Sequence, residues 1–205
     1  MFLTCAACRS GTHTAEDTWK RTGYCGLGRA VTALGLDTDQ PIELDYVCSS
    51  VGSIKPNLIE CIYNACQGNA AVAWLAQAVP ADPQPRLGDS GLKEYESRPK
   101  GGRKAKDSAP PETNVSDALS RIRVYYPSQE TVAQSIGGAR AAGTICFQQS
   151  YYQAPTFPQH VLRDCKSTRK GVLMHSKMLF VGQDGPDASK AFVYVGSANL
   201  SESAW

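Results

Sequence analysis

The chain has 205 residues, of which 42% are hydrophobic and 20% charged, and its formal net charge is +2. This is the composition of a globular protein long enough to bury a core, and it excludes a protein that attracts nucleic acid through its overall charge. No run approaches the ~18 apolar residues of a membrane span, and the opening MFLTCAACRS is too short and interrupted for a signal peptide. We therefore expect no membrane partner.

Eight cysteines without a secretory signal favour buried or free thiols in a reducing compartment. Cys5 and Cys8 form a lone C-x-x-C pair. A structural zinc site would need a second pair at similar spacing, and Cys61 and Cys66 do not supply it. We therefore expect no structural metal.

The first segment, residues 1–79, shows no clear period before about residue 24. After that point, apolar spacing and turn residues predict several elements. These are a helix over 26–36, a strand over 42–50, a turn over 50–53, a helix with Pro56 in its first turn and Gly68 beyond its end, and a second apolar helix over 70–79.

Residues 80–114 are rich in proline, glycine, serine and charges of both signs, which predicts a flexible charged insertion. The stretch 98–106 (RPKGGRKAK) holds five cations and no acid. Such a stretch can contact a phosphate backbone or act as a nuclear import signal, although a solvated loop is the commoner role.

The last segment, residues 115–205, alternates strands and helices. Ser128 is expected to cap a short helix that carries Glu130 in its first turn. Strands are predicted over 121–126, 143–148, 172–181 and 191–196, and a helix over 156–165 with Pro158 early in it. This order predicts an α/β fold with a mixed sheet covered by helices.

The two last strands carry the most informative residues. His175 and Lys177 are two apart in a predicted strand, so both side chains leave one face about 7 Å apart. If residues 182–190 form a hairpin loop, Val181 pairs with Ala191. That register places Lys177 opposite Val195 and His175 opposite Ser197, with Asn199 just beyond. An imidazole, an ammonium and a carboxamide then meet at one end of the sheet.

This combination suits a phosphate group. Lys177 supplies a fixed positive charge, Asn199 a neutral donor, and His175 a proton carrier near neutral pH. Together they are half of a phosphodiester-cleaving site that needs no metal. An isolated His-x-Lys pair is usually a polar pattern on a half-solvated face, but the G-S-x-N-L-S turn over 196–201 at the same sheet end favours a site.

The H-x-K pair followed by G-S-x-N-L-S and a nearby tryptophan resembles the second half-site of the phospholipase D superfamily. Most members have H-x-K-x4-D, whereas Gly182 occupies the aspartate position here. This departure is similar to the tyrosyl-DNA phosphodiesterase branch, whose signature is His-Lys-Asn. The stretches SSVGS, TGYCGLGRAV, GTICFQ, FPQHVLRDC and GVLMHSK also resemble that branch, its fungal members above all, and the likeness covers most of residues 20–205 apart from the insertion.

The resemblance implies a phospholipase D-like sandwich and a two-step reaction without a cofactor. A histidine of the N-terminal half-site attacks phosphorus and forms a phosphohistidine with the DNA 3′ end. His175 would protonate the leaving tyrosine and then activate water, while Lys177 and Asn199 stabilise charge on phosphorus. The implied partner is a single-stranded DNA 3′ end with a tyrosyl or peptide adduct, the expected location is the nucleus, and the complete enzyme is expected to be a monomer.

The serines of two turns are candidate phosphate ligands. In the SSVGS turn Gly52 permits close backbone approach, and free N–H groups with the serine hydroxyls would hold a DNA phosphate. Ser53 could instead merely cap the next helix, although both roles are compatible, and turn serines often bond their own backbone. The candidates are Ser50, Ser53, Ser197 and Ser201.

A second H-x-K is absent from the sequence, because His13 and His160 have no lysine two residues on. We therefore expect a fragment that holds the C-terminal domain only and is inactive alone. Three alternatives stay open: another phospholipase D-like hydrolase acting on lipid or RNA, a non-catalytic fragment that binds DNA ends, and a structural α/β domain with a coincidental motif.

Overall fold

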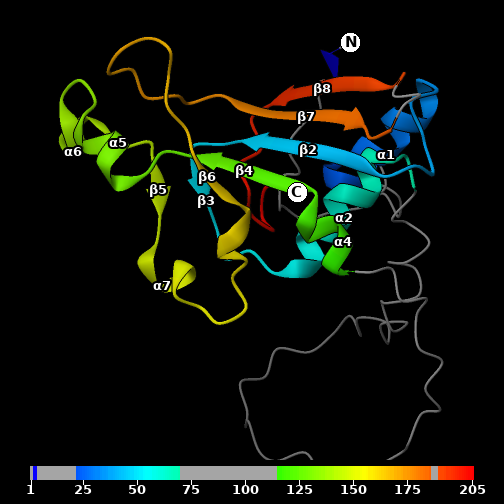
Figure 1. Ribbon diagram of the computed structural model, residues 1–205, viewed down its shortest axis with the longest axis horizontal. Coiled ribbons are helices and arrows are strands. Elements are labelled where there is room, and N and C mark those ends of the chain that lie inside the picture. Colours follow the sequence, from blue (N-terminus) through cyan, green and yellow to red (C-terminus); the bar gives the residue numbers. More distant parts are fainter. Residues whose placement is uncertain (1, 4–21, 70–114, 186–188) are drawn as a thin grey trace, which may run out of the picture.

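The computed structural model describes residues 2–3, 22–69, 115–185 and 189–205 (Figure 1). The predicted helix over 70–79, the insertion over 80–114 and the Cys5/Cys8 pair lie outside the described residues. So does most of the stretch before residue 22.

Six strands form one mixed sheet. Its order is β1 (Phe2–Leu3), β8 (Ala191–Gly196), β7 (Lys177–Gln183), β2 (Ile42–Val47), β4 (Ile122–Tyr126) and β6 (Leu162–Asp164). β7 is antiparallel to both of its neighbours, and the other pairs are parallel. Because β2 precedes the insertion and β4 follows it, the first and last segments build one sheet, which is the α/β arrangement predicted from the sequence.

One face of the sheet packs against helices α1 (Gly23–Ala33), α2 (Pro56–Cys66) and α4 (Val115–Ser120). The burial of β2 alternates along the strand, so its inward residues join helix residues in one hydrophobic core. The core includes Leu27 and Val31 of α1, Ile59 and Ile62 of α2, Ala118 of α4, and Leu44 and Tyr46 of β2. This buried face anchors the strand ends that carry the site.

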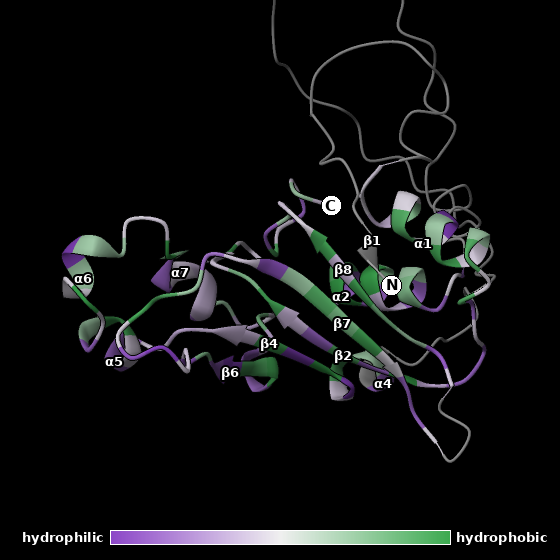
Figure 2. Ribbon diagram, turned by 90° about the horizontal axis from the view of Figure 1, so that it is seen from above, coloured by the Kyte–Doolittle hydropathy of each residue, from purple (hydrophilic) through white to green (hydrophobic). Residues whose placement is uncertain are grey.

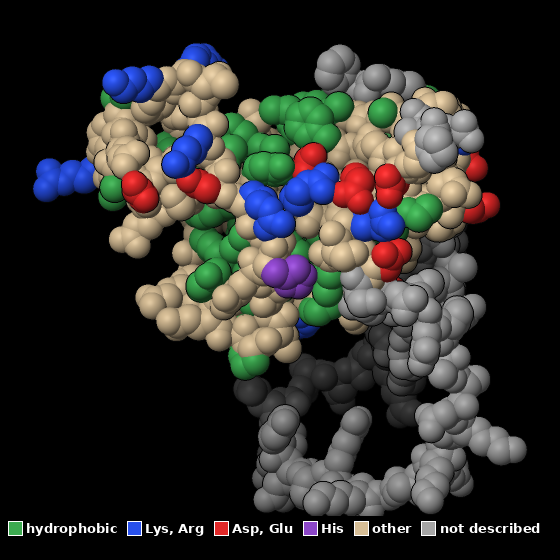
Figure 3. Space-filling view, viewed as in Figure 1, with side chains coloured by type: hydrophobic (Ala, Val, Ile, Leu, Met, Phe, Trp, Pro, Cys, Tyr) green, Lys and Arg blue, Asp and Glu red, His purple; other side chains and the backbone are tan. Residues whose placement is uncertain are grey.

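The opposite face is open and bears an ion-pair network across β2 and β4. Arg123 contacts Asp45 at 2.5 Å and Glu43 at 2.6 Å, and Arg121 joins Glu43 to Asp184. Figure 3 shows acidic and basic side chains interleaved across this face, with hydrophobic ones beside them over β7 and β8. In Figure 2 the same strands alternate between hydrophilic and hydrophobic residues.

The remaining elements lie beyond one end of the sheet, the end that is farther from α1 and α2 (Figure 1). A small parallel pair joins β3 (Ser50–Val51) to β5 (Cys146–Phe147). Around it lie the short helices α5 (Gln129–Ala133), α6 (Gly138–Ala141), α7 (Gln149–Tyr152) and the 3-10 turn η2 (Gln159–Val161).

Several local predictions are confirmed. Pro56 begins α2, and Gly68 follows its end with a φ of 79°. The Ser128 hydroxyl caps α5 by accepting the Thr131 N–H. The first helix begins at Gly23, three residues earlier than predicted. Gly23 is needed there because a Cβ would lie 1.7 Å from the Trp205 carbonyl oxygen.

Other predictions are wrong because long-range pairing overrides the local pattern. The helix over 156–165 is absent: residues 162–164 are instead the edge strand β6, which pairs with β4. The strand over 143–148 shortens to Cys146–Phe147, and that over 42–50 ends at Val47, since Ser50–Val51 pairs separately. The strand over 172–181 begins only at Lys177, so His175 precedes it. The hairpin register is shifted by one residue, with Gly182 opposite Ala191 and Lys177 opposite Gly196.

Candidate functional site

The predicted trio meets where β2 and β8 end and β7 begins. Lys177 is the first residue of β7 and is only 7% exposed. Its ammonium donates to the Ser49 hydroxyl at 2.7 Å and to the His175 carbonyl at 2.7 Å, and it lies 3.0 Å from His175 Nε2. These contacts occupy the three donors of an ammonium group, so the charge of Lys177 is held in place.

Burial lowers the pKa of Lys177, because removal from water disfavours the charged form. Burial also raises the pKa of Cys48, to about 12, so that thiol stays neutral. The ammonium is therefore a desolvated cation that depends on its oxygen and nitrogen partners.

His175 is exposed at the rim of the site. Since an ammonium can only donate, its contact with Nε2 makes that ring nitrogen an acceptor and leaves the proton of the neutral ring on Nδ1. The ring is thus oriented by Lys177 yet accessible from outside. The predicted proximity of His175 and Lys177 exists although residue 175 precedes the strand.

Asn199 lies three residues beyond the end of β8 and is half-buried. Its Oδ1 accepts the Ser50 N–H at 3.1 Å and the Ser49 hydroxyl at 3.3 Å. Because a backbone N–H can only donate, this contact fixes the orientation of the amide. The Nδ2 group is then the donor that Asn199 can offer to a ligand.

Ser49 is the residue that sequence reasoning missed as a site member. It is fully buried, and its hydroxyl accepts from Lys177 and donates to Asn199 Oδ1. Imidazole, ammonium, hydroxyl and carboxamide thereby form one continuous chain of contacts. The signal in the sequence was the position of Ser49 directly after Cys48, near the end of a predicted strand. A hydroxyl that is buried at such a position needs a hydrogen-bond partner.

The other serines occupy two turns that lie against each other. The Gly52 N–H donates to the Leu200 carbonyl at 2.8 Å, and a Cβ on Gly52 would meet the Ser201 Cβ at 2.7 Å. Gly52 therefore permits a close approach of two chain segments, and its N–H is already used. Ser53 is exposed and does not cap α2, whose N-cap is Lys55.

The structure places the predicted serines at different depths. Ser50 is half-buried in β3, and its N–H is bonded to Asn199. The Ser201 hydroxyl lies 3.1 Å from that of Ser203, and Ser197 is exposed just after β8. Ser50, Ser53 and Ser201 thus lie within the two turn segments, while Ser197 is an exposed residue directly after the end of β8.

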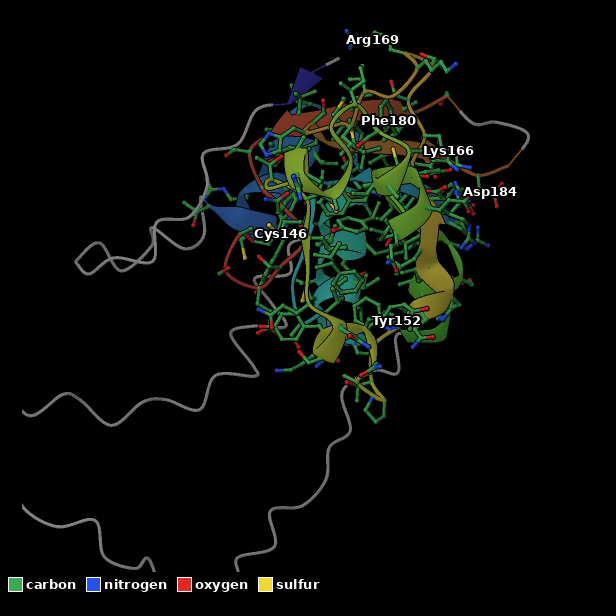
Figure 4. All side chains as sticks on the ribbon, turned by 90° about the vertical axis from the view of Figure 1, so that its left-hand side faces the viewer. Cys146, Tyr152, Lys166, Arg169, Phe180 and Asp184 are labelled. Carbon is green, nitrogen blue, oxygen red and sulfur yellow. The ribbon has the colours of Figure 1, made fainter. Side chains whose placement is uncertain are left out.

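A buried pair of aromatic residues supports the turn that carries Asn199. The Tyr46 hydroxyl donates to the Ala198 carbonyl at 2.8 Å and accepts from Trp205 Nε1 at 2.9 Å. The Trp205 ring also packs against Tyr46 and Tyr194. Figure 4 looks onto this end of the molecule, and the labelled Cys146 belongs to β5, which pairs with β3 at Ser50.

The remaining sequence candidates have other places. Cys25, Cys48, Cys61, Cys66, Cys146 and Cys165 are free thiols, as predicted. Within the described ranges, no group of His, Cys, Asp and Glu side chains could hold a metal ion. No helix in the same ranges is long and apolar enough to cross a bilayer. His160 lies in η2.

The mixed sheet with helices packed on one face fits a phospholipase D-like fold. A family model described as tyrosyl-DNA phosphodiesterase matches residues 7–205, which is nearly the whole chain. The chain therefore belongs to the tyrosyl-DNA phosphodiesterase family, and the family supports a phosphodiesterase hydrolase of DNA repair. No curated protein matches the chain.

Proposed function

We propose that this chain is part of an enzyme that hydrolyses the phosphodiester between a DNA 3′ end and a tyrosyl adduct, such as a trapped topoisomerase I. The contact chain from His175 through Lys177 and Ser49 to Asn199 is the observation that carries the proposal. It brings one fixed cation, one oriented amide and one proton carrier together at one end of the sheet. The reaction would pass through a phosphohistidine intermediate.

In this proposal each residue has a separate task. Lys177, whose donors are used within the fold, offsets the charge that develops on phosphorus through its positive charge, and the Nδ2 group of Asn199 donates to a non-bridging oxygen. His175 protonates the leaving oxygen and later deprotonates water. Its exposed ring supports this role, because the group that exchanges protons needs access to the substrate and to water.

The DNA strand would follow the two turns beside the trio. Ser50, Ser53 and Ser201 flank this path, and Ser197 lies at its edge. The proposed partner is a single-stranded DNA 3′ end with a tyrosyl or peptide adduct, and the proposed location is the nucleus. We also propose that the enzyme acts as a nuclease on DNA ends that carry no adduct.

We also propose that this chain alone has negligible turnover, because H-x-K occurs once in its sequence and a phosphohistidine needs a second histidine as nucleophile. The test combines the purified chain with a single-stranded oligonucleotide carrying 3′-phosphotyrosine. Binding without tyrosine release is expected, with weaker binding after His175→Ala, Lys177→Met or Asn199→Asp. Robust tyrosine release that His175→Ala abolishes would refute the proposal that the chain alone is inactive. The same result would support the proposed hydrolase activity.

The alternatives give different results in the same assay. Affinity that is unchanged by His175→Ala, without cleavage, favours a fragment that only binds DNA ends. Cleavage of a phosphatidyl substrate in preference to 3′-tyrosyl DNA favours another phospholipase D-like hydrolase. Affinity that none of the three substitutions alters contradicts the site itself.

A further inference from the structure

A wide hollow opens between the short helices beyond the end of the sheet. Its volume is about 910 Å3, and residues of α5, α6, α7, β5 and β6 line it. In Figure 1 β5 runs between α5 and α6 on one side and α7 on the other. The helices α5, α6 and α7 bury none of their residues. They therefore surround a space that their own side chains leave open.

One wall of the hollow is aromatic. Tyr126, Phe147 and Tyr152 line it, and the ring of Phe147 meets the other two edge to face, at centroid distances of 5.6 Å and 5.9 Å. Tyr152 is a large residue and is still 41% exposed. Aromatic side chains that are open to solvent inside a hollow offer flat surface on which another planar ring can stack.

Amide side chains lie around the aromatic wall. Gln129, Gln148 and Gln149 line the same hollow, and all three are exposed. Within the described ranges their side-chain amides make no hydrogen bond to the protein. Each amide has a carbonyl acceptor and an NH2 donor. The hollow therefore offers donors and acceptors that a ligand or water must satisfy.

The hollow also has a positive charge that the fold leaves available. Arg163 and Asp164 are the ionised residues among those that line it. The Asp164 carboxylate is already used, because it accepts the Ser128 N–H at 2.7 Å. Within the described residues, the exposed Arg163 guanidinium donates only through Nη1, to the carbonyls of His160 and Leu162. Its Nε and Nη2 groups are therefore free to bind an anion.

We propose that this hollow is a binding site for a nucleobase, with an attached phosphate directed toward Arg163. A nucleobase is flat, so it stacks on aromatic side chains, and its edge carries the donors and acceptors that glutamine amides pair with. An aliphatic ligand would leave the amides without partners, and an inorganic anion would leave the rings in water. A free nucleotide and a nucleotide of a DNA strand share this chemistry.

The hollow is separate from the site around His175 and Lys177, neither of which lines it. The strand β5 lies between the two. Its residue Cys146 pairs with Ser50 of the site turn, whereas the next residue, Phe147, lines the hollow. Neighbouring side chains of a strand point to opposite faces. The inference therefore goes beyond the proposed function and needs no step of the hydrolysis.

The first test compares two probes by isothermal titration calorimetry on the full chain. Adenosine 5′-monophosphate carries the base, and ribose 5-phosphate carries the same phosphate without it. We expect the mononucleotide to bind about tenfold more tightly, because stacking on the aromatic wall adds to the phosphate contact. Tyr152→Ser should reduce this ratio to about one while leaving the binding of ribose 5-phosphate unchanged. Tyr151→Ser is the matched control, since Tyr151 is the neighbouring tyrosine of α7 and does not line the hollow, and it should keep the ratio.

The second test distinguishes the two sources of the base. It compares a 3′-phosphorylated oligonucleotide with a copy whose nucleotides near the 3′ end are abasic. If the base belongs to a DNA strand, the abasic copy should bind about tenfold more weakly, and the mononucleotide should compete with the intact oligonucleotide. If the hollow takes a free nucleotide, the abasic copy should bind equally well, and the mononucleotide should bind a chain already saturated with oligonucleotide.

Tyr152→Ser should remove the effect of the base in whichever test shows it. Equal binding with and without the base in both tests would overturn the nucleobase site, and so would a base effect that Tyr152→Ser leaves unchanged. A base effect that is lost in Lys177→Met but kept in Tyr152→Ser would place the base at the other site and would also overturn it. Because neither test involves cleavage, such a failure is distinguishable from a failure of the proposed hydrolysis.

Discussion

The candidate site has a buried half and an exposed half, and their chemistry differs. Lys177 is 7% exposed and Ser49 is fully buried, and both are held by short contacts. His175, Ser53 and Ser197 are exposed at the rim. The groups that need fixed positions are thus set into the core, while the group that moves a proton stays accessible.

This division follows from the cost of reorganisation. A cation or dipole that is already oriented stabilises developing charge without further rearrangement. Lys177 is oriented because its ammonium has three partners in the fold, and burial still lowers its pKa. The buried half is therefore expected to contribute more to phosphate binding than to stability.

The largest expected effect comes from Lys177→Met, which removes the buried cation and keeps the shape of the side chain. The dissociation constant of a 3′-phosphorylated oligonucleotide should rise about 100-fold, or about 2.7 kcal/mol. The free energy of unfolding should change by less than ~1 kcal/mol, since replacing a buried charge by an apolar chain offsets the lost contacts. Fluorescence anisotropy and urea unfolding measure the two quantities.

Lys190→Met makes the same change of charge where β8 begins, at the opposite end from the site. It should alter binding by less than about twofold at moderate salt. If both variants weakened binding equally, the effect of Lys177 would be general electrostatics and the distinction between buried and exposed halves would fail.

Asn199→Asp is expected to have the next largest effect. The acceptor for Ser50 and Ser49 remains, so the free energy of unfolding should stay within ~0.5 kcal/mol of the wild type. The donor toward the phosphate is lost and a negative charge is added, so affinity should fall about tenfold. Asn69→Asp, at an exposed position after α2, adds the same charge as a control. A large loss of stability in Asn199→Asp alone would show that the amide nitrogen is structural.

The sequence predicted the exposed half and part of the buried half for a physical reason. The H-x-K pair lies where β7 begins and the G-S-x-N-L-S turn lies where β8 ends, and these strands pair as a hairpin, so local geometry was enough to bring His175, Lys177 and Asn199 to one end. The predicted pairing register of the hairpin was wrong by one residue. The conformation of the connecting loop sets this register, and the polar residues of the loop do not specify that conformation.

The missing parts depend on contacts between residues far apart in the chain. Ser49 meets Lys177 across 128 positions, and Tyr46 meets Trp205 across 159. Likewise, residues 162–164 form a strand only because β4 offers a free edge, which the local helical spacing could not reveal. Residue propensities and the periodicity of apolar residues predicted most helices and strands. Pairing between strands far apart in the sequence determined the segments that were predicted wrongly.

A smaller effect on binding is expected from Tyr46→Phe, which tests the support beneath the buried half. The Ala198 carbonyl and Trp205 Nε1 both lose their partner, so the free energy of unfolding should fall by about 1–3 kcal/mol. Affinity for the 3′-phosphorylated oligonucleotide should fall only about threefold, because the turn with Asn199 loosens but keeps its donors.

Tyr63→Phe is the control for this variant. Its hydroxyl also accepts a buried hydrogen bond, from the Ile42 N–H where β2 begins, far along the strand from the site. It should cost comparable stability without changing affinity. An equal loss of affinity in Tyr63→Phe would mean that Tyr46 acts through overall stability rather than through the turn.

The smallest expected effect is on the free energy of unfolding at alkaline pH, where Cys48 and Lys177 act in opposite directions. Burial raises the pKa of Cys48 to about 12 and that of Cys61 to about 11, from a usual value of 9.0. From about pH 9 upward the unfolded thiols lose protons that the folded thiols keep, so stability falls as pH rises. Lys177 acts in the opposite direction, because its lowered pKa makes the folded chain release a proton before the unfolded chain does.

Urea unfolding between about pH 8 and about pH 11 measures this pH dependence. The free energy of unfolding should fall less steeply with pH for Cys48→Ala than for the wild type, and more steeply for Lys177→Met. Slopes that both match the wild type would mean that neither group is desolvated in the folded protein, and the buried half of the site would not exist as described.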